Sequence, residues 1–277
     1  MEEKTSFSVS MCVYHADNPE WFNTAVESIL NQSAPPDEVV IVVDGPVGEK
    51  LNKVIEKYKK NEKIKVIRLC ENMGHGKARR KGLENCSNEL VALMDADDIS
   101  LPDRFEKQLK VFEKKDISVI GGNIAEFIEN PEKHVGYRTV SQKHEDIEKY
   151  LKKRCPFNQM TVMFKKSDVE KAGGYKDWFC NEDYYLWLRM YKCGMKFENI
   201  PDVLVNVRVG EEMYKRRGGK KYFKSEYGIQ KYMLSEKIIG IPLFCVNVVK
   251  RFIVQVLLTE KMRSWVFKKF ARKKRID

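Results

Sequence analysis

The strongest constraint on the fold is a run of five apolar residues, VVIVV, at Val39–Val43. A strand with no polar position is typical of a parallel sheet that is covered on both faces. We expect further strands at Phe7–Val13, Ile64–Leu69 and Leu90–Met94, with segments of helical apolar spacing between them. This alternation predicts an α/β fold with a mostly parallel central sheet flanked by helices.

The second half of the chain continues the pattern. A helix is expected from Arg104 to about Lys115, a strand at 118–128, a strand, helix and Gly-Gly turn within 161–175, and a helix at 181–194. No internal repeat or low-complexity linker separates these parts. We therefore predict one compact unit over residues 1–210 and a distinct helical region over 211–277.

The positive charge of the chain, a net +11, is concentrated at its end. Residues 211–277 hold 18 Lys or Arg and six Asp or Glu, whereas residues 1–210 hold 33 and 34. A basic tail on a neutral body points to an anionic partner, either a membrane surface or a nucleic acid.

The segment Ile238–Leu258 is rich in apolar residues, but Lys250 and Arg251 interrupt it. A charged pair in mid-segment is costly inside a bilayer, which argues against a spanning helix. We expect an amphipathic segment that lies in the membrane interface, with Trp265 and Phe267 at the headgroups. The basic residues expected to meet anionic lipid are Lys268, Lys269 and Arg272–Arg275. The alternative is a helix packed on the domain with a solvated basic end.

The cysteines and the N-terminus indicate the compartment. Seven scattered cysteines with no CxxC pair argue against a disulfide framework or a zinc site. The first residues are acidic and contain no apolar signal region. We expect a cytoplasmic protein that is peripheral on the inner face of the cell membrane.

The stretch LVALMDADDISLPDRF places Asp95, Asp97 and Asp98 directly after a buried strand. Ligands of open α/β sheets bind beyond the carboxyl ends of the strands. If the chain is still extended there, Asp95 and Asp97 face the same side. Two such carboxylates suit Mg²⁺, whose other positions water and phosphate oxygens fill. The alternative is a polar turn that only caps the following helix.

The order of segments over roughly residues 6–210 resembles glycosyltransferase family 2, which has the GT-A fold. The resemblance is carried by SVSMCVYHADNPEWFNTAVESILNQS, EVVIVVDGP, ENMGHGKARRKGL, ALMDADDISLPDRFEKQ, GGY and NEDYYLWLR. It implies an inverting transfer of a sugar from a nucleotide-sugar, usually a UDP-sugar, with a divalent metal such as Mn²⁺ or Mg²⁺. Residues 1–105 would bind the nucleotide-sugar and 106–210 the acceptor. The acceptor would be a saccharide, lipid-linked if the protein serves bacterial surface-polysaccharide assembly.

The resemblance also assigns residues to the donor. DAD looks like the family's DxD motif, so Asp97 would be the main metal ligand and Asp95 would contact the ribose or help to hold the metal. Asp44 matches the acid used at the uracil ring, although VVDGP replaces the commoner VVDDGS and lacks one acid. Val13 and Tyr14 would flank the nucleotide.

Three positively charged positions are candidates for the diphosphate. Arg79 matches the arginine of the family's N-x-G-x-x-x-A-R loop and would either contact phosphate or form a buried ion pair. Arg208, or Lys215–Arg217, would close over the diphosphate as a mobile clamp.

The segment NEDYYLW resembles the family's ED motif at the start of a helix. Asp183 would be the general base that takes the proton of the acceptor hydroxyl, with Glu182 as the competing candidate. The alternative is that both acids only cap a helix. The residues expected to contact the acceptor are Asn158, Gln159 and Trp178, although Trp178 could equally be a packing residue.

Two rival functions fit parts of the sequence. A nucleic-acid-binding protein would use the basic tail, but no RNP, KH or zinc-finger pattern is present and the aromatic residues are not interleaved with the basic run. We therefore expect no nucleic-acid partner. A nucleotidyltransferase on a similar sheet is the other rival; neither GxGxxG nor GxxxxGK[ST] occurs, which disfavours dinucleotide and P-loop enzymes.

Overall fold

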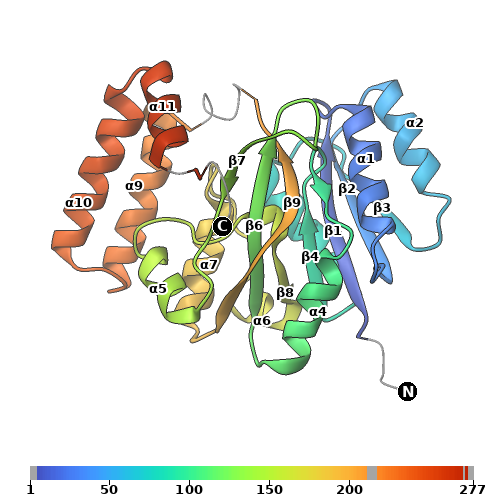
Figure 1. Cartoon of the computed structure of the whole chain (residues 1–277), viewed down its shortest axis with the longest axis horizontal. Coiled ribbons are helices and arrows are strands. Elements are labelled where there is room, and N and C mark those ends of the chain that lie inside the picture. Colours follow the sequence, from blue (N-terminus) through green and yellow to red (C-terminus); the bar gives the residue numbers. More distant parts are fainter. Residues whose placement is uncertain (1–4, 211–216, 271, 274–277) are drawn as a thin grey trace.

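A nine-stranded sheet runs through the computed structural model, which describes residues 5–210, 217–270 and 272–273 (Figure 1). The strand order is β3-β2-β1-β4-β8-β6-β9-β5, and β7 pairs with β6 outside this path. Helices cover the sheet, so the predicted α/β fold with a mostly parallel sheet is confirmed.

The first half of the sheet is entirely parallel. Its strands are β1 (Phe7–Tyr14), β2 (Glu38–Asp44), β3 (Ile64–Arg68) and β4 (Leu90–Met94), and the helices between them are α1 (Pro19–Leu30), α2 (Glu49–Tyr58) and α3 (His75–Asn85). Alternate side chains of β2 enter two different apolar clusters: Val39, Ile41 and Val43 join one, and Val40 and Val42 join the other. Burial on both faces explains why this strand has no polar position between Glu38 and Asp44.

The second half of the sheet contains both parallel and antiparallel strand pairs. Its elements are β5 (Ile99–Ser100), α4 (Arg104–Lys114), β6 (Val119–Phe127), β7 (His134–Arg138), α5 (His144–Leu151), the 3₁₀ turn η1 (Gln159–Thr161), β8 (Met163–Lys165), α6 (Lys166–Lys171), α7 (Glu182–Lys192) and β9 (Phe197–Arg208). Strand β8 is antiparallel to both β4 and β6, and joins the two halves. Five of these elements, β5, β7, α5, η1 and β9, were not predicted from the sequence.

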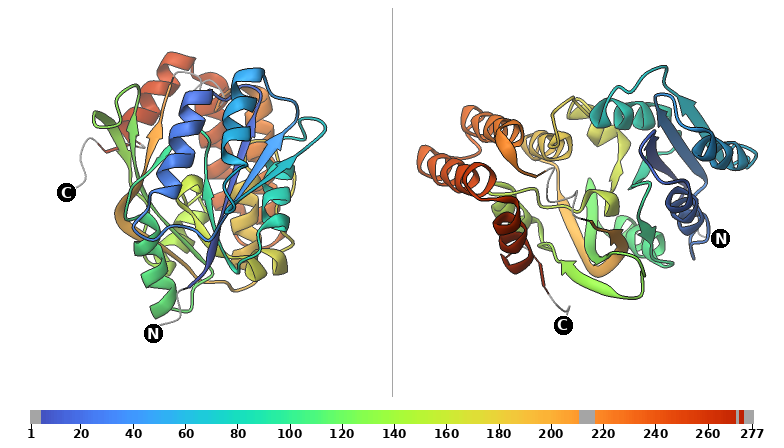
Figure 2. Two further views of the ribbon diagram at one scale, coloured as in Figure 1. Left: turned by 90° about the vertical axis from the view of Figure 1, so that its right-hand side faces the viewer. Right: turned by 90° about the horizontal axis from the view of Figure 1, so that it is seen from above.

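The C-terminal helices gather at the end of the molecule opposite α1 and α2 (Figures 1 and 2). They are α9 (Gly219–Ser235), α10 (Ile241–Phe252), a π-helical turn η2 (Ile253–Leu257) and α11 (Glu260–Phe270). Ile229 and Met233 of α9 belong to the same apolar cluster as Trp187 of α7. After α11, Lys273 pairs with Tyr137 of β7, so the chain returns to the sheet.

Candidate active site

The carboxyl ends of the parallel strands meet at one edge of the sheet. Tyr14 at the end of β1 is the register partner of Asp44 at the end of β2. Met11 of β1 is the partner of Met94, the last residue of β4, so the chain leaves the sheet at Asp95 on the same side. The sequence therefore correctly predicts that these acids share one edge.

Asp44 is 5% exposed and holds the loop that precedes α3. Its two carboxylate oxygens accept hydrogen bonds from the backbone N–H groups of Met73 at 2.7 Å and Gly74 at 3.1 Å. The next residue, Gly45, has φ +87°, and a Cβ there would lie 2.6 Å from the backbone nitrogen of Asn72. Only glycine fits between the two loops. Each oxygen of Asp44 keeps a second lone pair for a ligand.

Val13 and Tyr14 differ in what they can offer a nucleotide. Val13 is fully buried in the core, and neither its side chain nor its backbone is exposed. Tyr14 is 38% exposed, and its N–H donates to Asp17 Oδ2 at 2.8 Å. A side-chain contact from Val13 is therefore ruled out, whereas the Tyr14 ring is accessible.

The acidic turn after β4 is tied to the end of β9. Asp98, which the sequence did not assign to the site, is 2% exposed and accepts the backbone N–H of Arg208 at 2.9 Å. The Arg208 Nε donates to the backbone oxygen of Asp97 at 3.3 Å. Its guanidinium also lies against two rings, 4.3 Å from the Trp21 centroid and 4.6 Å from that of Phe127. Arg208 is thus placed beside the acidic turn, and these contacts hold its side chain in position.

Of the alternative residues predicted to close over the diphosphate, Lys215–Arg217, the structure describes one. Lys215 and Arg216 lie outside the described residues. Arg217 is described and precedes α9.

Arg79 forms the buried ion pair that the sequence left as one of two alternatives. Its side chain is 2% exposed, and Nη2 lies 2.6 Å from Asp95 Oδ1. With the Gln159 amide oriented to satisfy both neighbours, its oxygen accepts from Arg79 Nε at 3.0 Å and its nitrogen donates to Asp183 Oδ2 at 2.8 Å. A continuous polar chain, Asp95–Arg79–Gln159–Asp183, therefore connects the acidic turn to the start of α7.

The two acids at the start of α7 have different environments. Glu182 is 6% exposed and lies 3.0 Å from His75 Nδ1. Burial opposes its ionisation, but the hydrogen bond and charge of His75 outweigh burial and lower its pKa. Asp183 is half-buried; burial and the charge of Glu182 raise its pKa to about 6. Such divergent environments separate a catalytic carboxyl from a supporting one.

The acidic turn also places several carboxylates close to one another. Burial, together with the charges of Asp97 and Asp95, raises the pKa of Asp17 to about 7 even though the Tyr14 N–H stabilises its carboxylate. The same causes raise the pKa of Asp98 well above its ordinary value. A divalent cation would relieve this repulsion, so the side chains fit such an ion.

Protein ligands alone do not form a closed metal site here. Within the described ranges, no group of three or more His, Cys, Asp or Glu side chains is arranged to hold a metal. Oxygens of water and of a bound phosphate would have to complete the coordination, as is usual for Mg²⁺.

The residues predicted to contact the acceptor have three different roles. Asn158 is 1% exposed, and its Nδ2 donates to the Gly122 backbone oxygen at 2.8 Å. It braces β6 and cannot reach a sugar, so that prediction is corrected. Gln159 bridges Arg79 and Asp183 as described above. Trp178 is half-buried; its Nε1 donates to the Ser225 backbone oxygen at 3.2 Å, which favours the packing interpretation.

Phe179, next to Trp178, is an exposed aromatic residue that the sequence reading did not single out. It is 43% exposed, and the Lys221 amine lies 4.1 Å from its ring centroid. Its position in the loop before Asp183 makes it a better candidate for stacking on a sugar than Trp178.

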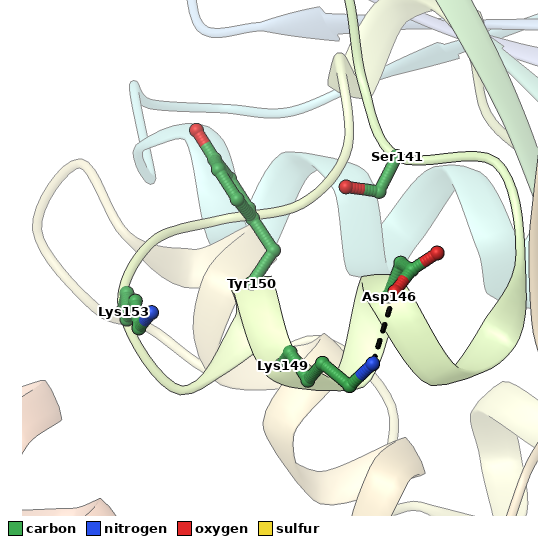
Figure 3. A pocket seen from close by; sticks show the side chains of 5 residues that line it. All are labelled: Ser141, Asp146, Lys149, Tyr150 and Lys153. Carbon is green, nitrogen blue, oxygen red and sulfur yellow. Dashed lines mark hydrogen bonds and ion pairs between the residues drawn. The ribbon is translucent and has the colours of Figure 1, made fainter.

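A hollow lies at α5 (Figure 3). It is lined by Ser141, Asp146, Lys149, Tyr150 and Lys153. Lys149 Nζ lies 3.1 Å from Asp146 Oδ1, and the Tyr150 side chain points away from that pair. None of the predicted site residues lines it.

Comparison with known proteins identifies the family models that match. Residues 8–170 match the model described as "Glycosyl transferase family 2", and residues 90–267 match "Glycosyl transferase family group 2". An Escherichia coli "UDP-Gal:alpha-D-GlcNAc-diphosphoundecaprenol beta-1,3-galactosyltransferase" is 37% identical over 98% of each chain. The "Amylovoran biosynthesis glycosyltransferase AmsE" of Erwinia amylovora is 38% identical over 84% of this chain and 88% of its own.

Solved structures share the fold at low identity. S. aureus TarS 1–349 in complex with UDP-GlcNAc superimposes with a TM-score of 0.68 at 17% identity, over 96% of this chain and 76% of that one. The mannosyltransferase PcManGT from Pyrobaculum calidifontis, in complex with GDP-Man and Mn²⁺, gives a TM-score of 0.63 at 14% identity, over 97% and 76% of the two chains.

Proposed function

Because the chain belongs to glycosyltransferase family 2, we propose that it transfers a sugar from a UDP-sugar to a lipid-linked saccharide during surface-polysaccharide synthesis. The family establishes a glycosyltransferase; the donor, the acceptor and the residue roles below are the proposal. Family membership also decides against the nucleotidyltransferase and nucleic-acid-binding alternatives as the main activity.

The observation that carries the proposal is the chain Asp95–Arg79–Gln159–Asp183. It links the acidic turn, where a diphosphate would bind, to a half-buried carboxyl whose pKa is raised to about 6. A base with a pKa near that value is ionised at neutral pH and still accepts a proton effectively. Glu182 is tied to His75, so Asp183 is the better candidate for the base.

The reaction follows from this placement. The acceptor hydroxyl attacks the anomeric carbon on the side opposite the diphosphate, and Asp183 takes its proton. The glycosidic bond forms as the bond from the sugar to the diphosphate oxygen breaks, and UDP leaves. A single displacement inverts the anomeric configuration.

A divalent cation at the acidic turn is part of the proposal. Asp97 would hold it, with Asp95 assisting from its ion pair with Arg79. When bound, the cation would neutralise charge on the diphosphate as a Lewis acid. The crowding of carboxylates that raises the pKa of Asp17 supports this assignment, as does the Mn²⁺ with which the Pyrobaculum mannosyltransferase is complexed.

Positive charge beside Asp183 supports the proposal that the acceptor carries a lipid diphosphate. Arg138 Nη2 donates to the Cys155 backbone oxygen at 3.0 Å, and the Cys155 sulfur lies 3.6 Å from Asp183 Oδ2. Burial, and then the charges of Arg154 and Arg272, lower the pKa of Arg138 to about 10. An anionic group bound here would be attracted by the positive charge of Arg138 and its neighbours. The E. coli relative is named for a diphosphoundecaprenol acceptor of this chemistry.

Activity at the inner face of the cell membrane would suit such an acceptor. Cytoplasmic nucleotide-sugars and a membrane-bound lipid diphosphate meet at that surface, so we propose a peripheral location there.

The test is a donor and acceptor screen with the full chain. UDP-, GDP- and dTDP-sugars are incubated with Mn²⁺ or Mg²⁺, with and without a saccharide attached to a diphosphate lipid. We expect acceptor-stimulated release of UDP from a UDP-sugar. Release of UMP or pyrophosphate, or no stimulation by any saccharide acceptor, would contradict the proposal.

A further inference from the structure

Helix α10 and the turn η2 bury polar side chains and leave several apolar ones exposed, which is unusual for a helix packed on a domain. Leu243 and Phe244 pack against the domain, but the two most buried side chains are polar: Asn247 is 4% exposed and Gln255 is 7% exposed. The side chains that face away are apolar. We call them the outer face: Ile241 (68% exposed), Val246 (46%), Val249 (55%), Phe252 (41%), Ile253 (44%) and Leu257 (61%).

Specific contacts fix the rotation of the helix in this orientation. Asn247 Nδ2 donates to Gln230 Oε1 of α9 at 2.9 Å and to the Lys152 backbone oxygen at 3.0 Å. Arg251 Nε forms an ion pair with Glu226 Oε2 of α9 at 2.6 Å, and both side chains are largely buried. Turning the helix to hide its apolar side would break these bonds and leave buried polar groups unpaired.

The outer face lies at the surface of the molecule. Helix α10 is the outermost element at the left of Figure 1, with α9 between it and α7. On α11, Met262 and Trp265 are 52% and 57% exposed. A contiguous exposed apolar surface of this kind marks an interaction site.

Charge identifies the partner. Exposed Lys250 and Lys261 flank the outer face, and the Lys269 amine lies 4.7 Å from the Trp265 ring. Residues 211–277 carry 18 Lys or Arg against six Asp or Glu. Pairing with a second copy would bring two such basic regions together, which disfavours self-association. Apolar side chains edged by amines suit an anionic lipid surface, where the former enter between the headgroups and the latter meet phosphate.

The end of the basic tail does not all belong to this surface. Arg272 Nε forms an ion pair with Glu126 Oε1 of β6 at 2.6 Å, and both side chains are buried, so Arg272 is not placed to meet lipid. The side chains of Phe267 and Lys268, and all of residues 274–277, lie outside the described part of the chain. The argument therefore rests on α10, η2 and the first turns of α11.

The helix would lie along the membrane. No helix in the described part of the chain is long and apolar enough to cross a bilayer. The outer face instead presents one side of α10 and η2, which is the geometry of an interfacial helix.

We propose that the outer face of α10 and η2, with Met262 and Trp265, docks the protein on an anionic lipid surface. The sequence predicts an interfacial segment; the structure indicates which side chains would enter the lipid and shows that Asn247 and Arg251 are held by α9. The proposal does not rest on the transfer reaction, because lipid binding needs neither donor nor acceptor.

The experiment is vesicle co-sedimentation of the full chain with phosphatidylcholine vesicles, with and without phosphatidylglycerol, at low and high salt. We expect binding to the anionic vesicles that weakens with salt. Val249→Glu should weaken it roughly tenfold or more, since a carboxylate replaces an apolar group at the interface. Val135→Glu is a matched control, because Val135 is 57% exposed on β7 and is not part of the outer face.

Three results would overturn the proposal. The wild-type protein could fail to bind anionic vesicles, or Val249→Glu could bind as well as Val135→Glu. Sedimentation velocity could also show a dimer that Val249→Glu dissociates, which would make a second copy the occupant. Circular dichroism and thermal melting confirm that each variant is folded; if Val249→Glu does not fold, Ile253→Ser replaces it in the same comparison.

Discussion

The guanidinium of Arg79 and the carboxylate of Asp95 form an ion pair with 2.6 Å between Nη2 and Oδ1. The same guanidinium bonds through Nε to Gln159, which in turn bonds to Asp183. The arginine therefore joins the two ends of the candidate site through different nitrogens. A lysine could not do so, since its single ammonium lacks the fixed fork of donors.

Gln159→Leu should slow transfer and move its pH dependence. The hydrogen bond from Gln159 stabilises the ionised form of Asp183, so its loss raises the pKa of that carboxyl, by about one unit. We expect a lower kcat at neutral pH, a pH midpoint shifted upward and a nearly unchanged KM for the donor. The measurement is initial rate against pH.

Gln142→Leu is the control for this substitution, because Gln142 is exposed and lies outside the polar chain. An unshifted midpoint in Gln159→Leu would show that Gln159 does not position the base.

Removal of the divalent cation should weaken the binding of UDP at the acidic turn. A chelator should abolish the extra thermal stability that UDP and Mn²⁺ together give the wild-type protein. Asp97→Asn should show the same loss without a chelator, since an amide is a weak ligand for a hard cation. Thermal shift with UDP alone and with UDP plus Mn²⁺ checks this. A full Mn²⁺-dependent shift in Asp97→Asn would exclude Asp97 as the ligand.

The pH profile of the wild-type enzyme should report Asp183. Its pKa is about 6, so the ionised base is present above that pH and transfer should fall about tenfold per unit below it. Because this folded-state pKa lies above the ordinary 3.8, ionisation of Asp183 opposes folding, and its cost is fully present above pH 6. Asp183→Asn should therefore raise the melting temperature at pH 7, and the difference should shrink as the pH falls toward 4.

The parallel half of the fold was predictable because its strands are continuous apolar runs such as Val39–Val43. Strand β9 was missed because Pro201 interrupts its pattern, and proline demotes a strand in sequence reading. In the structure the register between β6 and β9 shifts at Gly122 and Asn123, and Asn123 Nδ2 donates to the Pro201 backbone oxygen. The irregularity accommodates the proline, and no local signal indicates it.

The sequence predicted which residues form the candidate site better than it predicted the hydrogen bonds between them. The motifs indicated Asp95, Asp97 and Asp183. The link through Gln159 could not be predicted, because it depends on how side chains from segments far apart in the chain are oriented. The sequence analysis gave Asp98 no role, whereas it is buried and accepts the backbone N–H of Arg208. Asn158 looked like a polar contact for a sugar because sequence alone does not show that the side chain is buried and that its amide nitrogen donates to β6.

Which apolar side chains of α10 stay exposed could not be predicted from the sequence alone. Its apolar and polar sides are visible in the residue pattern, but which side faces the domain depends on partners in α9, such as Gln230 and Glu226.

The most direct test of the account is acceptor-stimulated UDP release by Asp183→Asn, measured beside its thermal shift with UDP and Mn²⁺. We predict that transfer falls by roughly 10²–10⁴-fold while the thermal shift equals that of the wild type, because only proton removal is lost. Transfer within a few-fold of the wild-type rate would contradict the assignment of Asp183 as the base.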